Sequence, residues 1–325
     1  MRPPSRTALA AAFTTIYLVW GSTYLGIRIA VETLPPFLMA GVRFVLAGAL
    51  LLAWLAVTRG WRATARQWRD NAIIGTFLLL GGNGMICWAE QVLPSGLTAL
   101  LIGSQPLIMV LTEWIWRGGR PPRPVTWAGL LLGFGGVAWL AAPWQDPAAG
   151  GLNRAGVAAV LAGCVAWAIG SIYGRHVRAP AEPLAASAMQ MLGGGGALLL
   201  AALIHGELAG ISPAAFSARS GLAFGYLIVV GSLVGYSTFV WLMKHSTPAR
   251  VSTYAYVNPL VAVLLGWLVL GEPVTGRVLT AAAVIVASVV IITSWSRRAA
   301  PLASAALPSP LLPTKAIAAK SERSS

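Results

Sequence analysis

The sequence contains one apolar pattern twice, 153 residues apart. Residues 103–118 read GSQPLIMVLTEWIWRG, and residues 256–271 read YVNPLVAVLLGWLVLG. The match at this shift also includes the apolar run before each of these segments. The matching pairs are Gly82/Gly235, Trp88/Trp241, Pro106/Pro259, Leu107/Leu260, Trp114/Trp267 and Gly118/Gly271. Because the pairs keep their order, the pattern indicates an internal duplication, and a duplication fixes the architecture of a chain.

The duplication extends further once loop lengths are allowed to differ. Shifts of 149 and 147 residues add the pairs Gly21/Gly170, Ser22/Ser171, Tyr24/Tyr173, Gly48/Gly195, Leu51/Leu198 and Leu52/Leu199. We therefore predict two related halves, residues 9–142 and residues 155–296, between an N-terminal tail of residues 1–8 and a C-terminal tail of residues 299–325. The C-terminal tail is rich in Ala, Pro and Ser without periodicity, and this composition predicts disorder.

The composition excludes a soluble protein. Of 325 residues, 57% are apolar and only 10% are charged, whereas a soluble domain carries about a quarter of charged residues. The two cysteines, Cys87 and Cys164, lie inside apolar runs. Neither a disulfide framework nor a CxxC metal or redox site is therefore available.

Ten apolar stretches are long enough to cross a bilayer, which takes about 20 residues per helix. Their approximate cores are residues 9–28, 36–58, 71–92, 96–116, 125–142, 155–174, 184–205, 220–243, 249–271 and 277–295. We predict an all-α multi-pass membrane protein with ten transmembrane helices. Since each half has five, the second half crosses the membrane in the opposite sense, which gives the two inverted five-helix repeats typical of secondary transporters.

The charges set the expected orientation. Fifteen Lys and Arg lie in the loops on one side of these spans and four in the loops on the other. The positive-inside rule then places both termini in the cytoplasm. A net charge of +14 would suggest nucleic acid on a soluble protein, but basic clusters between apolar runs mark cytoplasmic loops, so no nucleic-acid partner is expected.

Polar residues recur at helical spacing on several spans, and such stripes face a cavity or a partner helix rather than lipid. Asn83, Cys87 and Glu90 share one face, as do Tyr254 and Asn258 beside a proline. Interhelical hydrogen bonding is the alternative for each. The residues that we expect to line a substrate cavity are Trp20, Tyr24, Asn83, Gln105, Ser171, Tyr254 and Asn258.

Pro106 and Pro259 occupy equivalent positions near the middle of two spans. Each removes a helical hydrogen bond, so we predict a helix kink at both. Interrupted helices at corresponding places in two halves point to the binding site of a transporter. The alternative is a packing kink whose free carbonyl a neighbouring helix satisfies.

Arg43 and Glu90 are ionisable groups inside predicted spans, where charges are costly. A buried pair between them is the natural arrangement, because either charge alone would be expensive. Three roles remain open for these residues: a structural pair, a contact to an anionic or zwitterionic substrate, and a carboxylate that couples transport to protons.

The sequence lacks the motifs of two other classes of membrane protein, intramembrane enzymes and ATP-driven pumps. The chain has no HExxH, no GxSxG and no P-loop, so neither an intramembrane enzyme nor an ATP-driven pump is expected, and no metal or cofactor is predicted. A channel or uncoupled facilitator remains the alternative to a carrier. The expected partners are a small-molecule substrate and the lipid bilayer, with protons as a candidate coupling ion and the number of subunits left open, a single chain included.

Five segments carry a family resemblance: WGSTY at 20–24, PPFLMAGVRF at 35–44, GGNG at 81–84, AEQ at 89–91 and STYAYVNP at 252–259. With ten spans in two halves, the chain resembles the drug/metabolite transporter superfamily, its EamA family and, within it, the YedA-like inner-membrane exporters. The resemblance implies a bacterial inner-membrane protein that exports amino acids, other metabolites or drugs by alternating access. Similar proteins often carry Gly-Glu after the fourth and ninth spans; here only Gly271-Glu272 is present, and Gly118-Gly119 stands at the other place.

Overall fold

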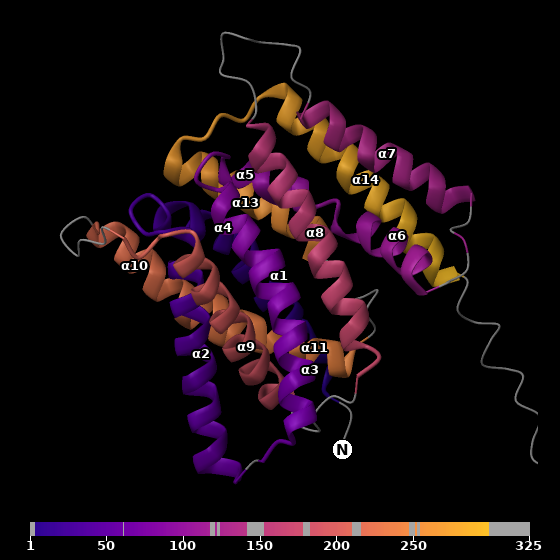
Figure 1. Ribbon diagram of the computed structural model, residues 1–325. Helices are drawn as coiled ribbons and strands as arrows, with labels where there is room; N and C mark the ends of the chain where they lie inside the picture. The colour runs from indigo at the N-terminus through magenta and orange to yellow at the C-terminus, as the bar shows by residue number, and fades with distance from the viewer. Residues whose placement is uncertain are drawn as a thin grey trace, which may run out of the picture.

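The computed structural model describes residues 4–60, 62–117, 121, 124–141, 153–177, 183–209, 216–246, 251 and 254–298. Within these ranges every regular element is a helix, and the helices form one bundle (Figure 1). The predicted disordered tail, residues 299–325, lies outside the described residues. The all-helical class predicted from the sequence is confirmed.

The first half of the chain begins with two long helices. Helix α1 starts after Ser5, whose hydroxyl accepts from the Ala8 N–H at 3.1 Å, as an N-cap does. Helix α2 ends at Arg59, and Gly60 directly after it takes the left-handed conformation with φ 55° that glycine permits. The helices of this half are α1 (Arg6–Ala30), α2 (Pro36–Arg59), α3 (Ala65–Gly75), the π-helix η1 (Thr76–Gly84), α4 (Met85–Ala89), α5 (Ser95–Ile102), α6 (Gln105–Arg117) and α7 (Pro124–Ala141).

The second half repeats this series of elements apart from α5, whose counterpart, residues 248–255, lies largely outside the described residues. Its helices are α8 (Arg154–Gly174), α9 (Pro183–Ile204), α10 (Ala218–Tyr226), the π-helix η4 (Leu227–Tyr236), α11 (Ser237–His245), α13 (Tyr254–Leu270) and α14 (Gly276–Arg298). A π-helical segment therefore interrupts the third span of each half, between α3 and α4 and between α10 and α11. Both segments contain glycines, which tolerate such departures from α-helical geometry.

Helices or runs of contiguous helices occupy all ten predicted spans. Seven of these helical runs are long and apolar enough to cross a membrane, and two shorter apolar helices, Val257–Leu270 and Gly276–Ser288, accompany them in the described part of the chain. The fourth span differs from the expected continuous helix, because Gly103 and Ser104 separate α5 from α6.

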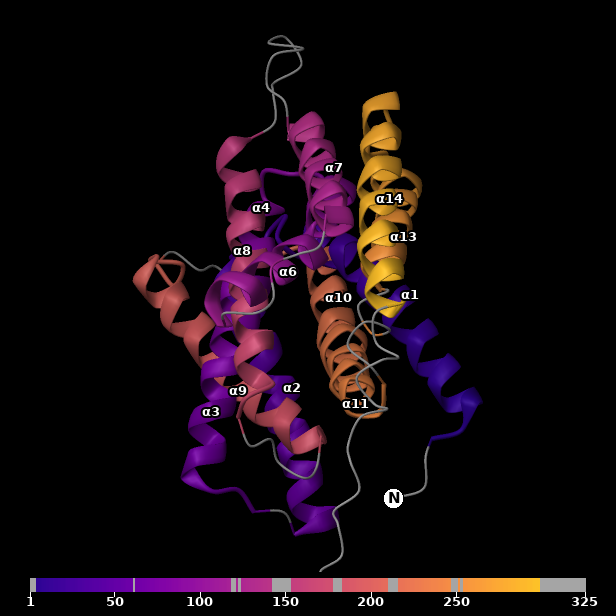
Figure 2. The same cartoon turned by 90° about the vertical axis from the view of Figure 1, so that its right-hand side faces the viewer.

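Helices from different halves pack against each other in matching pairs. Helix α2 packs on α9, and α7 packs on α14, a pair that runs side by side in both views (Figure 1, Figure 2). Helix α1 packs on η4 and α13, and α8 correspondingly packs on η1 and α6. Close approach needs glycine where α3 meets α9, since a Cβ on Gly75 would lie 2.1 Å from the carbonyl oxygen of Gln190.

Two carboxylates from the second half cap helices of the first half at the upper end of the bundle in Figure 1, where α5 begins. Helices α2 and α5 each begin after a proline, without a side-chain cap of their own. Glu207 accepts from the N–H groups of Phe37 and Leu38 at 3.2 and 2.8 Å. Glu272 accepts from Ser95 N and Oγ, both at 2.8 Å, and from Gly96 N at 3.0 Å. Each carboxylate satisfies free N–H groups at the positive end of a helix.

Candidate functional site

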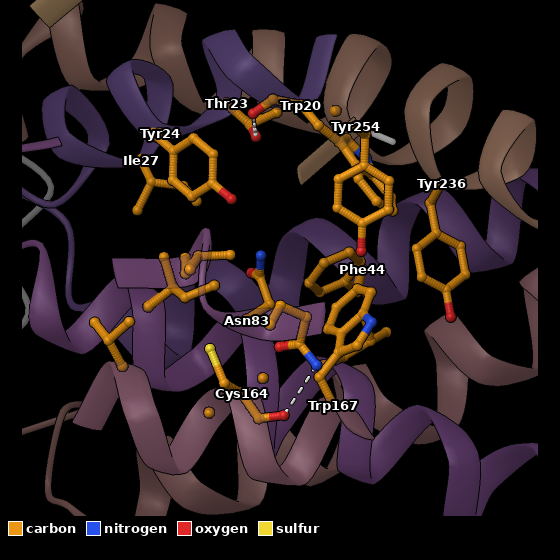
Figure 3. A pocket seen from close by; sticks show the side chains of 18 of the residues that line it. Trp20, Thr23, Tyr24, Ile27, Phe44, Asn83, Cys164, Trp167, Tyr236 and Tyr254 are labelled. Atoms are coloured by element: carbon orange, nitrogen blue, oxygen red, sulfur yellow. Dashed lines mark hydrogen bonds between the residues drawn. The ribbon is translucent and has the colours of Figure 1, made fainter. Parts of the chain in front are cut away.

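A cavity lies in the centre of the bundle, and helices of both halves build its wall (Figure 3). The volume open to the centres of water-sized molecules is about 80 Å³, several times the roughly 10–15 Å³ that one water needs. The residues that line it are Trp20, Thr23, Tyr24, Ile27, Arg43, Phe44, Leu79, Gly82, Asn83, Ile86, Ile102, Gln105, Val160, Gly163, Cys164, Trp167, Gly231, Tyr236 and Tyr254.

Aromatic rings pack around Trp20 on one side of the cavity. Its ring centre lies 4.8 Å from that of Tyr254 and 6.0 Å from that of Trp167, both in edge-to-face geometry. Phe239 lies behind these rings, 4.8 Å from Trp20. Aromatic pairs in such geometries add about 0.5–1.5 kcal/mol each beyond their burial, so this wall is firmly held and suits an apolar or flat ligand.

Polar groups reach the cavity from α1, η1, α6 and α13, in addition to Arg43 of α2. Gln105, the first residue of α6, donates its Nε2 to the carbonyl oxygen of Cys164 in α8 at 3.1 Å. The hydroxyl groups of Tyr24 and Tyr254 point toward the middle of the cavity, near Asn83 (Figure 3). A few placed polar groups in an apolar wall are what small-molecule sites use to fix the orientation of a ligand.

Arg43 is the charged residue of the cavity wall. Its side chain is 3% exposed, and its guanidinium carbon lies 4.2 Å from the centre of the Phe44 ring. Nη2 donates to Asn83 Oδ1 over a long 3.4 Å. Nε and Nη1 have no hydrogen-bond partner, so most of the donor capacity of this guanidinium is unused.

Glu90 is fully buried and lies outside the cavity wall. Both of its carboxylate oxygens lack a hydrogen-bond partner, and Arg28 donates to its backbone carbonyl instead. The Arg43–Glu90 pair expected from the sequence is therefore not hydrogen-bonded. The two side chains come from different helices. Glu90 directly follows α4, whereas Arg43 lies on α2 and contacts Asn83 of the π-helix η1.

A chain of hydrogen bonds leads from the cavity to the end of the bundle where α3 begins. The hydroxyl of Tyr236 points away from the cavity and donates to Gln190 Oε1 at 2.6 Å (Figure 3). Gln190 in turn donates to Asn71 Oδ1 at 2.9 Å, and Asn71 donates to the carbonyl oxygen of Gln67 at 2.8 Å. These bonds join η4 and α9 of the second half to α3 of the first.

The structure brings five of the seven predicted cavity residues together, namely Trp20, Tyr24, Asn83, Gln105 and Tyr254. Asn258 and Ser171 are not in the wall. Asn258 is buried, and its amide nitrogen, once oriented toward the carbonyl oxygens of Tyr17 and Tyr254, lies 3.2 Å from each. Asn258 therefore ties α13 to α1, and Ser171 is partly buried in α8.

The two prolines take different places. Pro106 is the second residue of α6, directly after the interruption at Gly103 and Ser104. A proline is readily accommodated there, because the first turn of a helix has no N–H bond to lose. Pro259 lies inside α13, which continues through it.

Several wall residues were not expected from the sequence. Tyr236 is the repeat partner of Asn83 at the shift of 153 residues, so applying the duplication to Asn83 would have identified it. Trp167 and Phe44 stand in continuous apolar runs, where no periodic signal separates a cavity face from a lipid face. The described residues contain no group of three or more His, Cys, Asp or Glu that could hold a metal.

Apolar spans around a central cavity of mixed polarity are typical of polytopic helical membrane proteins that handle small molecules. The chain belongs to the EamA-like transporter family, whose model matches twice, over residues 7–142 and 154–294. The family and the names of its relatives indicate a membrane transporter and not an enzyme.

Curated relatives cover most of the chain. The inner membrane transporter YedA of Escherichia coli strain K12 is 38% identical over 286 residues, which are 83% of this chain and 90% of that protein. The transporter YvbV of Bacillus subtilis strain 168 is 27% identical over 84% of this chain and 87% of its own. Protein PecM of Dickeya dadantii is 28% identical over 80% and 84%. The resemblance seen in the sequence motifs is confirmed.

A solved crystal structure shares the fold. It matches with a TM-score of 0.64 at 24% sequence identity, over 90% of this chain and 99% of that one. At this identity the similarity shows only that the two proteins share an arrangement of helices.

Proposed function

We propose that the protein is a secondary transporter that exports small metabolites, such as amino acids or related compounds, or drugs across the bacterial inner membrane by alternating access. The observation that carries the proposal is the central cavity, whose wall combines aromatic and polar side chains from both halves. A site at the interface of two halves can open to either side as the halves rock.

Equivalent contacts within the two halves support the inverted repeat on which such rocking depends. Arg43 and Gln190 are partners at the shift of 147 residues, and Asn83 and Tyr236 are partners at the shift of 153. Arg43 contacts Asn83 within the first half, and Tyr236 contacts Gln190 within the second. The same pair of positions is therefore in contact in each half, and the two π-helical segments also correspond.

The orientation follows from the basic loops. With both termini in the cytoplasm, the upper end of the bundle in Figure 1 faces away from the cytoplasm. The carboxylates of Glu207 and Glu272 then hold helices together on the external side. In an alternating-access cycle, these contacts would have to break for the cavity to open to the outside.

The direct test is metabolite profiling. Medium from cells that overexpress the protein is compared with medium from cells that lack it, together with a panel of drug tolerances. We expect at least one metabolite to accumulate outside or one drug to be better tolerated. No difference in either readout, with membrane insertion verified, would contradict export.

Channel-like conduction is the alternative function, and saturable counterflow separates the two. Protein reconstituted in vesicles with a solute found by profiling should exchange labelled for unlabelled solute, as carriers do. Single-channel current steps would overturn the carrier mechanism.

A further inference from the structure

The guanidinium of Arg43 is a buried cation, and no carboxylate of the described residues forms a hydrogen bond or an ion pair with it. A guanidinium stays protonated in proteins, and a buried charge without a partner is strongly unfavourable. Nε and Nη1 nevertheless lack a hydrogen-bond partner, and the contact from Nη2 to Asn83 is 3.4 Å long. Two of the three nitrogens therefore remain free for a further acceptor.

The carboxylates of the described residues are engaged elsewhere or lie apart. Glu207 and Glu272 cap helices, Asp70 pairs with Arg66 and Arg69, and Glu113 pairs with Arg175. Glu32 is exposed, and Glu90 is buried without a hydrogen bond to Arg43. Among the described residues, therefore, no carboxylate contacts the guanidinium, and its free N–H groups are available to the carboxylate of a ligand.

The rest of the cavity defines the body of that ligand. Phe44, Tyr24, Trp167 and Tyr236 supply apolar and aromatic surface, and Gln105 and Asn83 supply amide groups. Glu90, the buried carboxylate nearest in sequence to these groups, is not in the wall. The wall therefore offers a positive charge together with apolar surface, and it offers no carboxylate for a cationic group.

We propose that Arg43 binds the carboxylate of the transported molecule, so that the substrate is a small organic acid with an apolar or aromatic body. This inference rests on the proposed transport function. Arginine is suited to the task because its guanidinium matches the geometry of a carboxylate and is only weakly hydrated. Retaining an unpaired charge costs stability in the empty protein and is explained by the gain on binding.

Binding to the purified protein tests the proposal without requiring transport. The probes are acids paired with their neutral primary amides: 3-phenylpropionate, indole-3-acetate and 4-methylpentanoate. We expect at least one acid to bind at least tenfold more tightly than its amide. Arg43→Gln should remove that preference, while Arg219→Gln, which deletes an exposed charge outside the cavity, should retain it.

Thermal unfolding of the empty variants separates this role from a structural one. If Arg43 serves a ligand, Arg43→Gln leaves the melting temperature of the ligand-free protein unchanged or raises it, because an uncompensated charge is removed. Arg43→Lys should weaken the acid preference and keep part of it. A lowered melting temperature, no binding by any acid, or amides that bind as well as acids would each overturn the proposal. Export of a solute without a carboxylate would overturn it too and would leave the transport function standing.

Discussion

Gln105 and Asn258 are two buried amides from equivalent helices, and the structure gives them different neighbours. Gln105 lines the cavity and bonds to α8, while Asn258 is turned toward carbonyl oxygens of α1 and α13. From the sequence both were expected to line the cavity, each beside a proline on its own span. Periodicity identifies the polar face of a helix, but it does not distinguish a cavity from a neighbouring helix.

We therefore predict different effects of the two leucine variants on substrate binding. Gln105→Leu should weaken binding about tenfold or more and should also cost stability, because the carbonyl oxygen of Cys164 loses its donor. Asn258→Leu should mainly destabilise, by about 1–3 kcal/mol, because buried carbonyl groups lose their donor. Binding and thermal unfolding of both variants in detergent check this. Equal loss of affinity in both would contradict the separate placement.

The second prediction at the residue scale concerns Glu90. A buried carboxylate whose two oxygens have no hydrogen-bond partner is suited to holding a proton. Its charged surroundings are Arg28, Arg43 and Glu272. If Glu90 couples export to protons, Glu90→Gln abolishes the dependence of export on a pH gradient while facilitated exchange persists. Vesicles with imposed gradients measure this. Export that is still driven by the gradient in the variant would place coupling elsewhere.

At the scale of elements, hydropathy predicted the ten spans but not the type of helix within each span. A window of apolar residues has the same hydropathy in an α-helix, a π-helix or a broken helix, so hydropathy gave no signal for η1 or η4. Pro106 was the sequence signal nearest to the interruption between α5 and α6. The close contact of α3 with α9 was foreseeable only as a run of glycines, Gly193 to Gly196. The structure shows which of these glycines the contact requires.

Two glycines two residues apart on α9 test that contact. A Cβ on Gly194 would lie 2.4 Å from the carbonyl oxygen of Gly75, whereas a Cβ on Gly196 meets nothing within 4 Å. Gly194→Ala should destabilise by about 1–3 kcal/mol through overpacking. Gly196→Ala should be neutral or gain up to about 1 kcal/mol, since alanine is the better helix former. Thermal unfolding of the pair checks the packing, and similar losses in both would contradict it.

At the scale of the whole molecule, the two halves differ at their carboxylate caps. The repeat partners of Glu207 and Glu272 are Gly60 and Gly119, so the corresponding positions of the first half offer no carboxylate to the second. If external closure depends on Glu272, alternating access requires its bonds to Ser95 and Gly96 to break. The sequence predicted the duplication, and it also showed that the first half has Gly119 where the second half has Glu272. Only the structure shows that Glu272 binds Ser95 and Gly96 at the start of α5.

Glu272→Gln should therefore shift the protein toward the outward-open conformation. A hydrogen bond to a charged group contributes about 1.5–3 kcal/mol, so loss of the charge should change the ratio of the two conformations about tenfold. Glu32→Gln is the matched control, because Glu32 is an exposed carboxylate at the same end of the bundle. The external accessibility of the cavity, measured as described next, should rise in the first variant and stay unchanged in the control.

Cys164 provides the measurement that tests alternating access most directly. It lines the cavity, and Cys87 is the other of the two cysteines, so Cys87→Ala leaves a single natural reporter. Its reaction with a membrane-impermeant maleimide is followed from outside in intact spheroplasts and from the cytoplasmic side in inverted vesicles, with permeant N-ethylmaleimide as the control. We predict labelling from both sides, with the external rate raised about tenfold by Glu272→Gln. Labelling from one side alone, in both the parent and the Glu272→Gln protein, would contradict a cavity that opens alternately to the two faces of the membrane.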